Sequence, residues 1–153
     1  MNFQFADLPD IDSSYVVAVS LVAIPFLSFV HGTITGLKRR DAKCPYPNGY
    51  ASAQEMKTNR AAYEFNCAQR AHTQFLENAP QTMISMLVAG VMYPDSTTVL
   101  GTAWLGCRIL FLYGYIYSSK EQGKGRLVGS LFCLFQGGLW ALVALSAWNL
   151  LQE

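Results

Sequence analysis

Charge is what this sequence has least of. Only 14% of its 153 residues are Asp, Glu, Lys or Arg, against roughly a quarter in an average soluble domain. Hydrophobic residues make up 52%, and the mean hydropathy is +0.21. This composition argues against an ordinary soluble domain and excludes an intrinsically disordered chain. The net charge of +1 leaves no basic surplus for binding nucleic acid.

Sequence motifs for metal binding and for common types of catalysis are also missing. The four cysteines form no CxxC pair and the two histidines stand apart, so we expect no metal site. There is no glycine-rich phosphate loop and no nucleophile elbow. Cys44 stands beside a basic cluster, which makes it a candidate for palmitoylation.

Charged residues are absent from two long stretches, 13–37 and 127–152. Each exceeds the roughly 20 residues that a helix needs to cross a bilayer. A third stretch, 96–119, holds only Arg108. A fourth apolar stretch, 78–94, reaches spanning length only if the more polar turns before it are included.

The sequence therefore predicts an all-α protein, an integral membrane four-helix transmembrane bundle formed by one domain over residues 1–153. The alternative is a soluble four-helix bundle, but its helices would each show a polar outer face, and the stretch 127–152 has none. The four predicted helices lie near residues 13–37, 68–93, 96–118 and 127–151, with a long loop at 38–60.

Lys and Arg gather in two of the connections. The segment between the first and second helices, taken with the start of the second helix, and the segment between the third and fourth carry ten of the 11 basic residues. Basic loops face the cytosol, so we expect both of these loops there and both termini on the lumenal side.

The most informative residues are polar groups at membrane depth, where charge is costly and commonly functional. Asn66, Arg70, Gln74 and Glu77 recur at helical spacing and form one stripe along the second helix. Arg108, on the third helix, either pairs with Glu77 or contacts a substrate. Several cations, a carboxylate and amides facing the cytosol suit a small zwitterion with more than one carboxylate, such as glutathione, whose carboxylates arginines hold bidentately.

Three segments resemble the MAPEG family, the membrane-associated proteins in eicosanoid and glutathione metabolism. "FNCAQRAHTQFLENAP" (65–80) is similar to the family's second-helix motif, above all in its microsomal glutathione transferase type 3 branch. "CRILFLYGYIYS" resembles the third helix of that branch, and "LKRRDAKCPYP" resembles the basic end of its first helix.

The resemblance implies a homotrimer that binds glutathione between neighbouring subunits and activates its thiol for a lipophilic electrophile or a lipid hydroperoxide. It places the protein among membrane lipids, in the endoplasmic reticulum or the outer mitochondrial membrane, with the site facing the cytosol. It makes Arg126 the thiolate-stabilising residue, with Lys124 in reserve. The glutathione-binding residues that it implies are Arg39, Arg70, His72, Gln74, Glu77 and Tyr115.

The chain departs from the family pattern at several positions. Gln74 stands where the family has asparagine, Asn78 where leukotriene C4 synthase has tyrosine, and Phe111 replaces the usual tyrosine. These changes alter the fine geometry of a substrate site but keep the arginines that bind anions. The rival interpretations are a non-catalytic lipid-binding or scaffold protein of the same fold and a small transporter subunit, although polar groups along a transporter path are scarce in the lumenal half.

Overall fold

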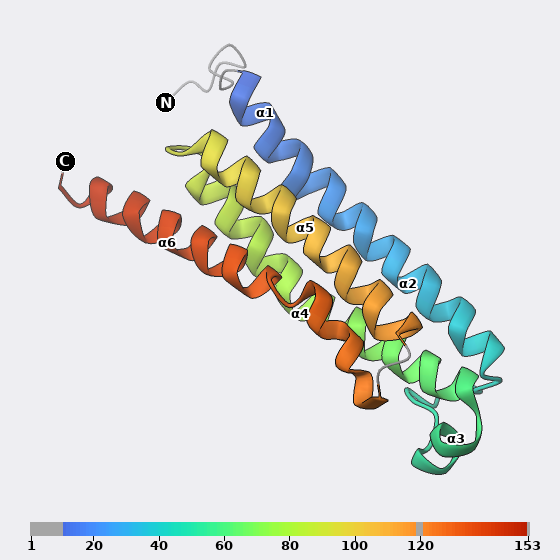
Figure 1. Cartoon of the computed structure of the whole chain (residues 1–153). Helices are drawn as coiled ribbons and strands as arrows, with labels where there is room; N and C mark the ends of the chain where they lie inside the picture. Colours follow the sequence, from blue (N-terminus) through green and yellow to red (C-terminus); the bar gives the residue numbers. More distant parts are fainter. Residues whose placement is uncertain (1–10, 119–120, 153) are drawn as a thin grey trace.

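The computed structural model describes residues 11–118 and 121–152 (Figure 1), and every regular element in this part of the chain is helical, in agreement with the predicted all-α class. The elements, in chain order, are α1 (Ile11–Val17), the π-helix η2 (Ala18–Ala23), α2 (Ile24–Asp41), α3 (Ala53–Thr58), α4 (Arg60–Ala89), α5 (Pro94–Tyr117), the 3₁₀-helix η3 (Glu121–Gly129) and α6 (Phe132–Leu150).

The first three elements form one continuous rod (Figure 1). The π-helical stretch directly precedes Pro25, which lies in the first turn of α2. Proline has no N–H and its ring clashes with the preceding turn. A π-helical turn widens the backbone there, and the N–H of Ile24 accordingly bonds the Val19 carbonyl, five residues back.

Several helix bounds differ from those that the sequence predicted. The second long helix begins at Arg60 instead of residue 68, because the Asn59 side chain caps it by accepting a hydrogen bond from the Ala61 N–H. The loop before it contains the short helix α3, which starts with a capping box between Ser52 and Glu55. The last α-helix begins at Phe132, because the glycine-rich residues before it form the 3₁₀-helix η3.

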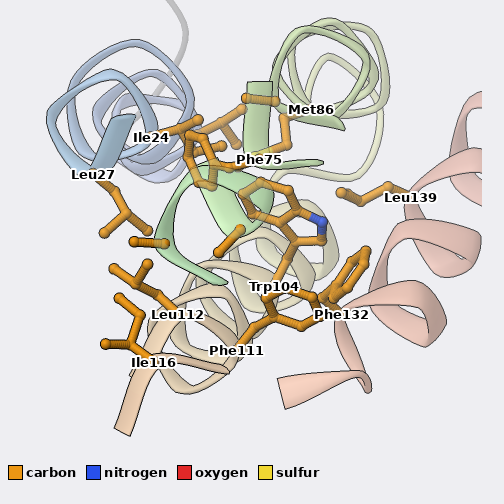
Figure 2. Packing of buried hydrophobic residues seen from close by; sticks show 14 residues of the cluster. Ile24, Leu27, Phe75, Met86, Trp104, Phe111, Leu112, Ile116, Phe132 and Leu139 are labelled. Atoms are coloured by element: carbon orange, nitrogen blue, oxygen red, sulfur yellow. The ribbon is translucent and has the colours of Figure 1, made fainter. Parts of the chain in front are cut away.

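The core lies between α2, α4 and α5, with α6 packed against its side (Figures 1 and 2). Phe75, Met86 and Trp104 are fully buried there, and Leu139 reaches them from α6 (Figure 2). A hydrogen bond from the Thr82 hydroxyl to the Gln136 side-chain oxygen joins α4 to α6 inside this apolar region. Such bonds between polar side chains hold helices together where lipid tails remove the hydrophobic driving force.

Three helices in the described part of the chain are long and apolar enough to cross a membrane: Ser13–Asp41, Pro94–Tyr117 and Phe132–Leu150. Helix α4 has 30 residues, about 45 Å at 1.5 Å per residue, so its length also suffices. It falls outside this group because many polar residues along it, including Gln74, Glu77 and Gln81, make it less hydrophobic than the other three helices.

The α2–α4 connection, the end of α5 and η3 lie at one end of the molecule, opposite the α4–α5 turn (Figure 1). Ion pairs join the helices at this end: Glu64 accepts from Lys38 at 2.8 Å and from Arg60 at 3.0 Å. Arg60 also donates to the Ser118 carbonyl at 3.3 Å, which ties the start of α4 to the end of α5. Two of the basic residues that were predicted to share one side of the membrane, Lys38 and Arg60, thus bind the same carboxylate at this end.

Candidate functional site

One face of α4 carries the charged pair Arg70 and Glu77. The two side chains are each 55% exposed, and their closest nitrogen and oxygen are 3.9 Å apart. This is an ion pair too long to be a hydrogen bond, so both groups keep their capacity to bind a ligand. Asn66, predicted in the same stripe, serves the loop instead: its side chain bonds both the N–H and the carbonyl of Ala51, each at 2.8 Å.

Arg108 does not pair with Glu77, contrary to one of the two alternatives for it. Its guanidinium donates to the Gln74 side-chain oxygen at 3.3 Å. Because Glu77 pairs with Arg70 on the exposed face, no carboxylate within ion-pair distance serves Arg108 in the described residues. The guanidinium lies 4.3–5.5 Å from the centres of four aromatic rings, those of Phe75, Trp104, Phe111 and Phe132.

This surrounding explains how a fully buried arginine is accommodated, since cation–π attraction partly replaces lost hydration. Its Nε and Nη2 have no hydrogen-bond partner among the described residues. The hydrogen bond from Arg108 holds the side-chain oxygen of Gln74 toward the guanidinium, so the amide nitrogen of Gln74 points away from Arg108. Arg108 therefore orients a residue of the candidate site and does not itself reach the surface.

His72 lies on a different face of α4 from Arg70. Residues two apart on a helix point about 200° apart, and the His72 ring packs 3.7 Å from the position that a Cβ on Gly32 of α2 would occupy. Its ring centre is 6.2 Å from that of His31, which is fully buried. The structure therefore does not bring His72 together with Arg70 and Glu77.

A cavity of about 150 Å³ opens between the start of α4, the end of α5 and η3. Tyr63, Cys67 and Tyr115 line it, together with Gly123 from η3. The Tyr63 hydroxyl accepts a hydrogen bond from the Gly123 N–H at 2.8 Å, which fixes η3 against α4. Burial raises the pKa of the Tyr63 hydroxyl, so the phenol stays protonated at neutral pH.

Arg126 contacts two of the residues that line this cavity, Tyr115 and Gly123. Its guanidinium stacks on the Tyr115 ring at 5.6 Å from the ring centre and donates to the Gly123 carbonyl at 3.0 Å. The Tyr115 hydroxyl is within electrostatic range of both Arg126 and Arg70. Tyr115 is thus a contact of Arg126 and within electrostatic range of Arg70, both predicted as site residues, whereas Lys124 is exposed.

Three glycines place Arg126 where it is. Gly125 lies directly against the Gly114 carbonyl, and Gly129 lies against the α5 backbone between the Cys107 carbonyl and the Phe111 nitrogen. A Cβ on any of these glycines would overlap backbone atoms, so η3 packs backbone to backbone on α5 only because side chains are absent. This close approach brings Arg126 over Tyr115.

Arg39 is held apart from this cavity by the loop after α2. It donates to the Asn48 carbonyl at 2.6 Å, and its guanidinium stacks between the rings of Tyr46 and Phe65 at 4.4 and 4.7 Å. Asn48 and Tyr46 could not be predicted as contacts of Arg39, because an irregular loop has no periodicity. Tyr63 was also missed, although it continues the polar stripe of α4 by one turn.

The residues found together are two arginines, a carboxylate, an amide and a tyrosine beside a small cavity at one end of a bundle of apolar helices. A sequence profile of the MAPEG family matches residues 17–147, which covers the helices that carry every one of these groups. That family includes glutathione-dependent enzymes and also non-catalytic members, and its proteins bind glutathione and reside in membranes. The chain belongs to the MAPEG family and is an integral membrane protein.

Proposed function

We propose that this protein is a glutathione transferase that activates the glutathione thiol for attack on lipophilic electrophiles, or for reduction of lipid hydroperoxides. The observation that carries the proposal is that the Arg126 guanidinium lies over Tyr115, which lines the cavity and is itself within electrostatic range of Arg70 on α4. The second-helix motif supports membership of the branch similar to microsomal glutathione transferase type 3.

Glutathione has two carboxylates, one ammonium group and one thiol. Arg70 would bind a carboxylate and Glu77 the ammonium, since both side chains are half exposed and 3.9 Å apart. The Gln74 amide, oriented by Arg108, would donate between them. Each hydrogen bond to a charged group contributes about 1.5–3 kcal/mol, so three such contacts explain selective binding of a tripeptide of this charge pattern.

A second subunit would complete the site. At about 150 Å³ the cavity is smaller than the roughly 300–1,000 Å³ typical of ligand pockets, so one chain alone offers less room than the whole tripeptide would need. Arg70 and Glu77 also stand exposed on a helix among membrane-spanning neighbours, where charge facing lipid is costly. A homotrimer in which each subunit covers this face of the next, with α4 as a fourth span, answers both requirements.

The Arg126 cation would supply the chemistry. A free cysteine thiol has a pKa of about 8.5. A guanidinium about 5 Å from the sulfur would stabilise a thiolate by roughly 3 kcal/mol at an effective dielectric constant of about 20. This lowers the thiol pKa by about two units, which makes thiolate the main form at pH 7. The thiolate then attacks the electrophile, or the hydroperoxide oxygen.

The second substrate would enter from the bilayer, because apolar side chains cover the outer faces of α2, α5 and α6. We expect the site to face the cytosol, in the endoplasmic reticulum or the outer mitochondrial membrane, since the basic loops at this end follow the distribution of cytosolic loops. No metal takes part in this mechanism.

The test is glutathione conjugation by the purified protein in lipid nanodiscs, followed with a chlorodinitrobenzene and with a lipid hydroperoxide. We expect turnover with at least one, and binding of glutathione by calorimetry. Glutathione binding without turnover would favour the scaffold alternative, and absence of both would contradict the proposal. Cavity size and the engagement of Arg39 by the loop are the two observations that favour this alternative.

A further inference from the structure

A second cavity, of about 360 Å³, lies at the end of α2, away from the one beside Tyr115. Three cations line it, Arg39, Arg40 and Lys43, and no acidic side chain does. Arg39 is engaged by the loop, but Arg40 and Lys43 are exposed and have no ion-pair partner among the described residues. A concave site with several unneutralised cations has the chemistry that binds a phosphate.

The backbone of Lys43 adds a second observation. The chain leaves α2 through a Schellman motif, in which the Cys44 N–H bonds the Arg39 carbonyl at 3.3 Å and the Lys43 N–H bonds the Arg40 carbonyl at 3.0 Å. Lys43 occupies the left-handed position of this motif, with φ 54°. Glycine is the residue that this position favours. A lysine there lowers the stability of the fold relative to glycine, but it adds a cation to the lining of the cavity.

The position of the cavity relative to the membrane indicates the source of the phosphate. The candidate span Ser13–Asp41 ends beside it. At the same end, the exposed rings of Tyr113 and Tyr117 pack with their centres 5.2 Å apart. The Lys38 ammonium lies 4.8 Å from the centre of the Tyr117 ring. Tyrosines and lysines of this kind mark the level of lipid headgroups.

The outer face of α2 offers an apolar surface for the acyl chain of a lipid. Gly36 lines the cavity, and a Cβ on it would have no atom within 4 Å. Phe29 lies two turns earlier on the same face and is 70% exposed. A molecule with a phosphate in the basic cavity and an apolar chain along Phe29 therefore fits this surface.

We propose that the cavity lined by Gly36, Arg39, Arg40 and Lys43 binds the phosphate headgroup of an anionic phospholipid. Basic pockets at the cytosolic end of membrane helices recognise such headgroups. The site is distinct from the cavity beside Tyr115, and the proposal does not depend on glutathione chemistry.

The experiment measures lipid binding to the purified full-length protein by native mass spectrometry, with dioctanoyl phosphatidylglycerol as the probe and dioctanoyl phosphatidylcholine as the comparison. We expect one phosphatidylglycerol per chain, bound at least about tenfold more tightly than phosphatidylcholine. Lys43→Gly and Arg40→Gln should each weaken phosphatidylglycerol binding about tenfold, the effect of one lost charge-assisted contact. Equal affinity for the two lipids would overturn the proposal.

Two variants separate binding from folding. Lys43→Gly should keep or raise the thermal unfolding temperature, because glycine suits the left-handed position, so its loss of lipid cannot come from misfolding. Gly36→Leu should block the cavity while keeping every cation, because the space there is open.

Lys57→Gln is the charge-matched control, since Lys57 is exposed on α3 and does not line the cavity. We expect it to leave lipid binding unchanged. If Lys43→Gly and Lys57→Gln weakened binding equally, the effect would be one of net charge and the site would be refuted. Glycerol phosphate and inorganic phosphate form the last arm: displacement of phosphatidylglycerol by either at equal concentration would assign the cavity to a free phosphate instead of a lipid.

Discussion

Arg126 is the residue whose removal should change the chemistry most and the binding least. Its guanidinium is 5.6 Å from the centre of the Tyr115 ring. A thiolate bound about 5 Å from this guanidinium would gain roughly 3 kcal/mol at an effective dielectric constant of about 20, so the thiol pKa would fall from about 8.5 to about 6.4. At pH 7 the thiolate fraction is then about 80%, against about 3% without the charge.

Arg126→Gln should therefore reduce turnover at pH 7 by roughly 25-fold, in proportion to the thiolate fraction. Glutathione affinity should change little, because the proposed contacts to its carboxylate and ammonium are at Arg70 and Glu77. The measurement is the pH dependence of kcat between pH 5.5 and 9.5, in which the apparent pKa should rise by about two units and turnover should recover at high pH.

Two further variants make this prediction specific. Arg126→Lys should retain part of the activity, because a point charge still favours the thiolate although it lacks the planar guanidinium. Lys124→Gln removes an exposed cation from the same 3₁₀-helix and should leave the pH profile unchanged. An unchanged profile for Arg126→Gln, together with a shifted one for Lys124→Gln, would refute the reasoning and assign the activating role to Lys124.

Three other outcomes are expected. Glu77→Gln should weaken glutathione binding roughly tenfold or more by calorimetry, the effect of one charge-assisted contact, while the elution volume in gel filtration stays unchanged. Intact affinity with a changed elution volume would make Glu77 structural. Gly129→Ala should lower kcat and the unfolding temperature together, because its methyl group would overlap the α5 backbone, and a crystal structure with η3 unmoved would contradict this. Hydrogen bonds from Ser52 lower the pKa of Glu55. The capping box of α3 should therefore persist at neutral pH and weaken as the pH falls through that lowered pKa. An NMR titration of the Glu55 carboxyl would follow this change, and titration at the ordinary pKa of a glutamate would refute the capping box.

The helical fold could be predicted because each transmembrane helix is indicated by many consecutive residues together, not by any single one. Runs without charge located the apolar helices, and a helix of known rise must fill a bilayer of known thickness. Helix ends were less predictable, because they depend on single hydrogen bonds. The Asn59 cap extends α4 to Arg60, and glycine contacts with α5 turn the residues before Phe132 into a 3₁₀-helix.

The candidate site could be predicted in part, for a related reason. Helical spacing placed Arg70, Gln74 and Glu77 on one face of α4, where the structure has them near one another. Helical spacing does not reveal which residues on other helices a side chain contacts. The ion pair between Arg108 and Glu77, one of the two alternatives for Arg108, was therefore wrong. Arg108 is instead surrounded by aromatic rings and donates a hydrogen bond to Gln74. Spacing also could not foresee that an irregular loop would bind Arg39.

The central claim is that this protein binds glutathione as a thiolate. The most direct measurement is stopped-flow absorbance near 240 nm, where thiolates absorb, after mixing the protein in nanodiscs with glutathione at pH 7. The account predicts an absorbance rise that saturates with glutathione concentration, is absent with S-methylglutathione, and is reduced more than tenfold in Arg126→Gln. Saturable binding by calorimetry with no absorbance rise at any pH below 8 would contradict it.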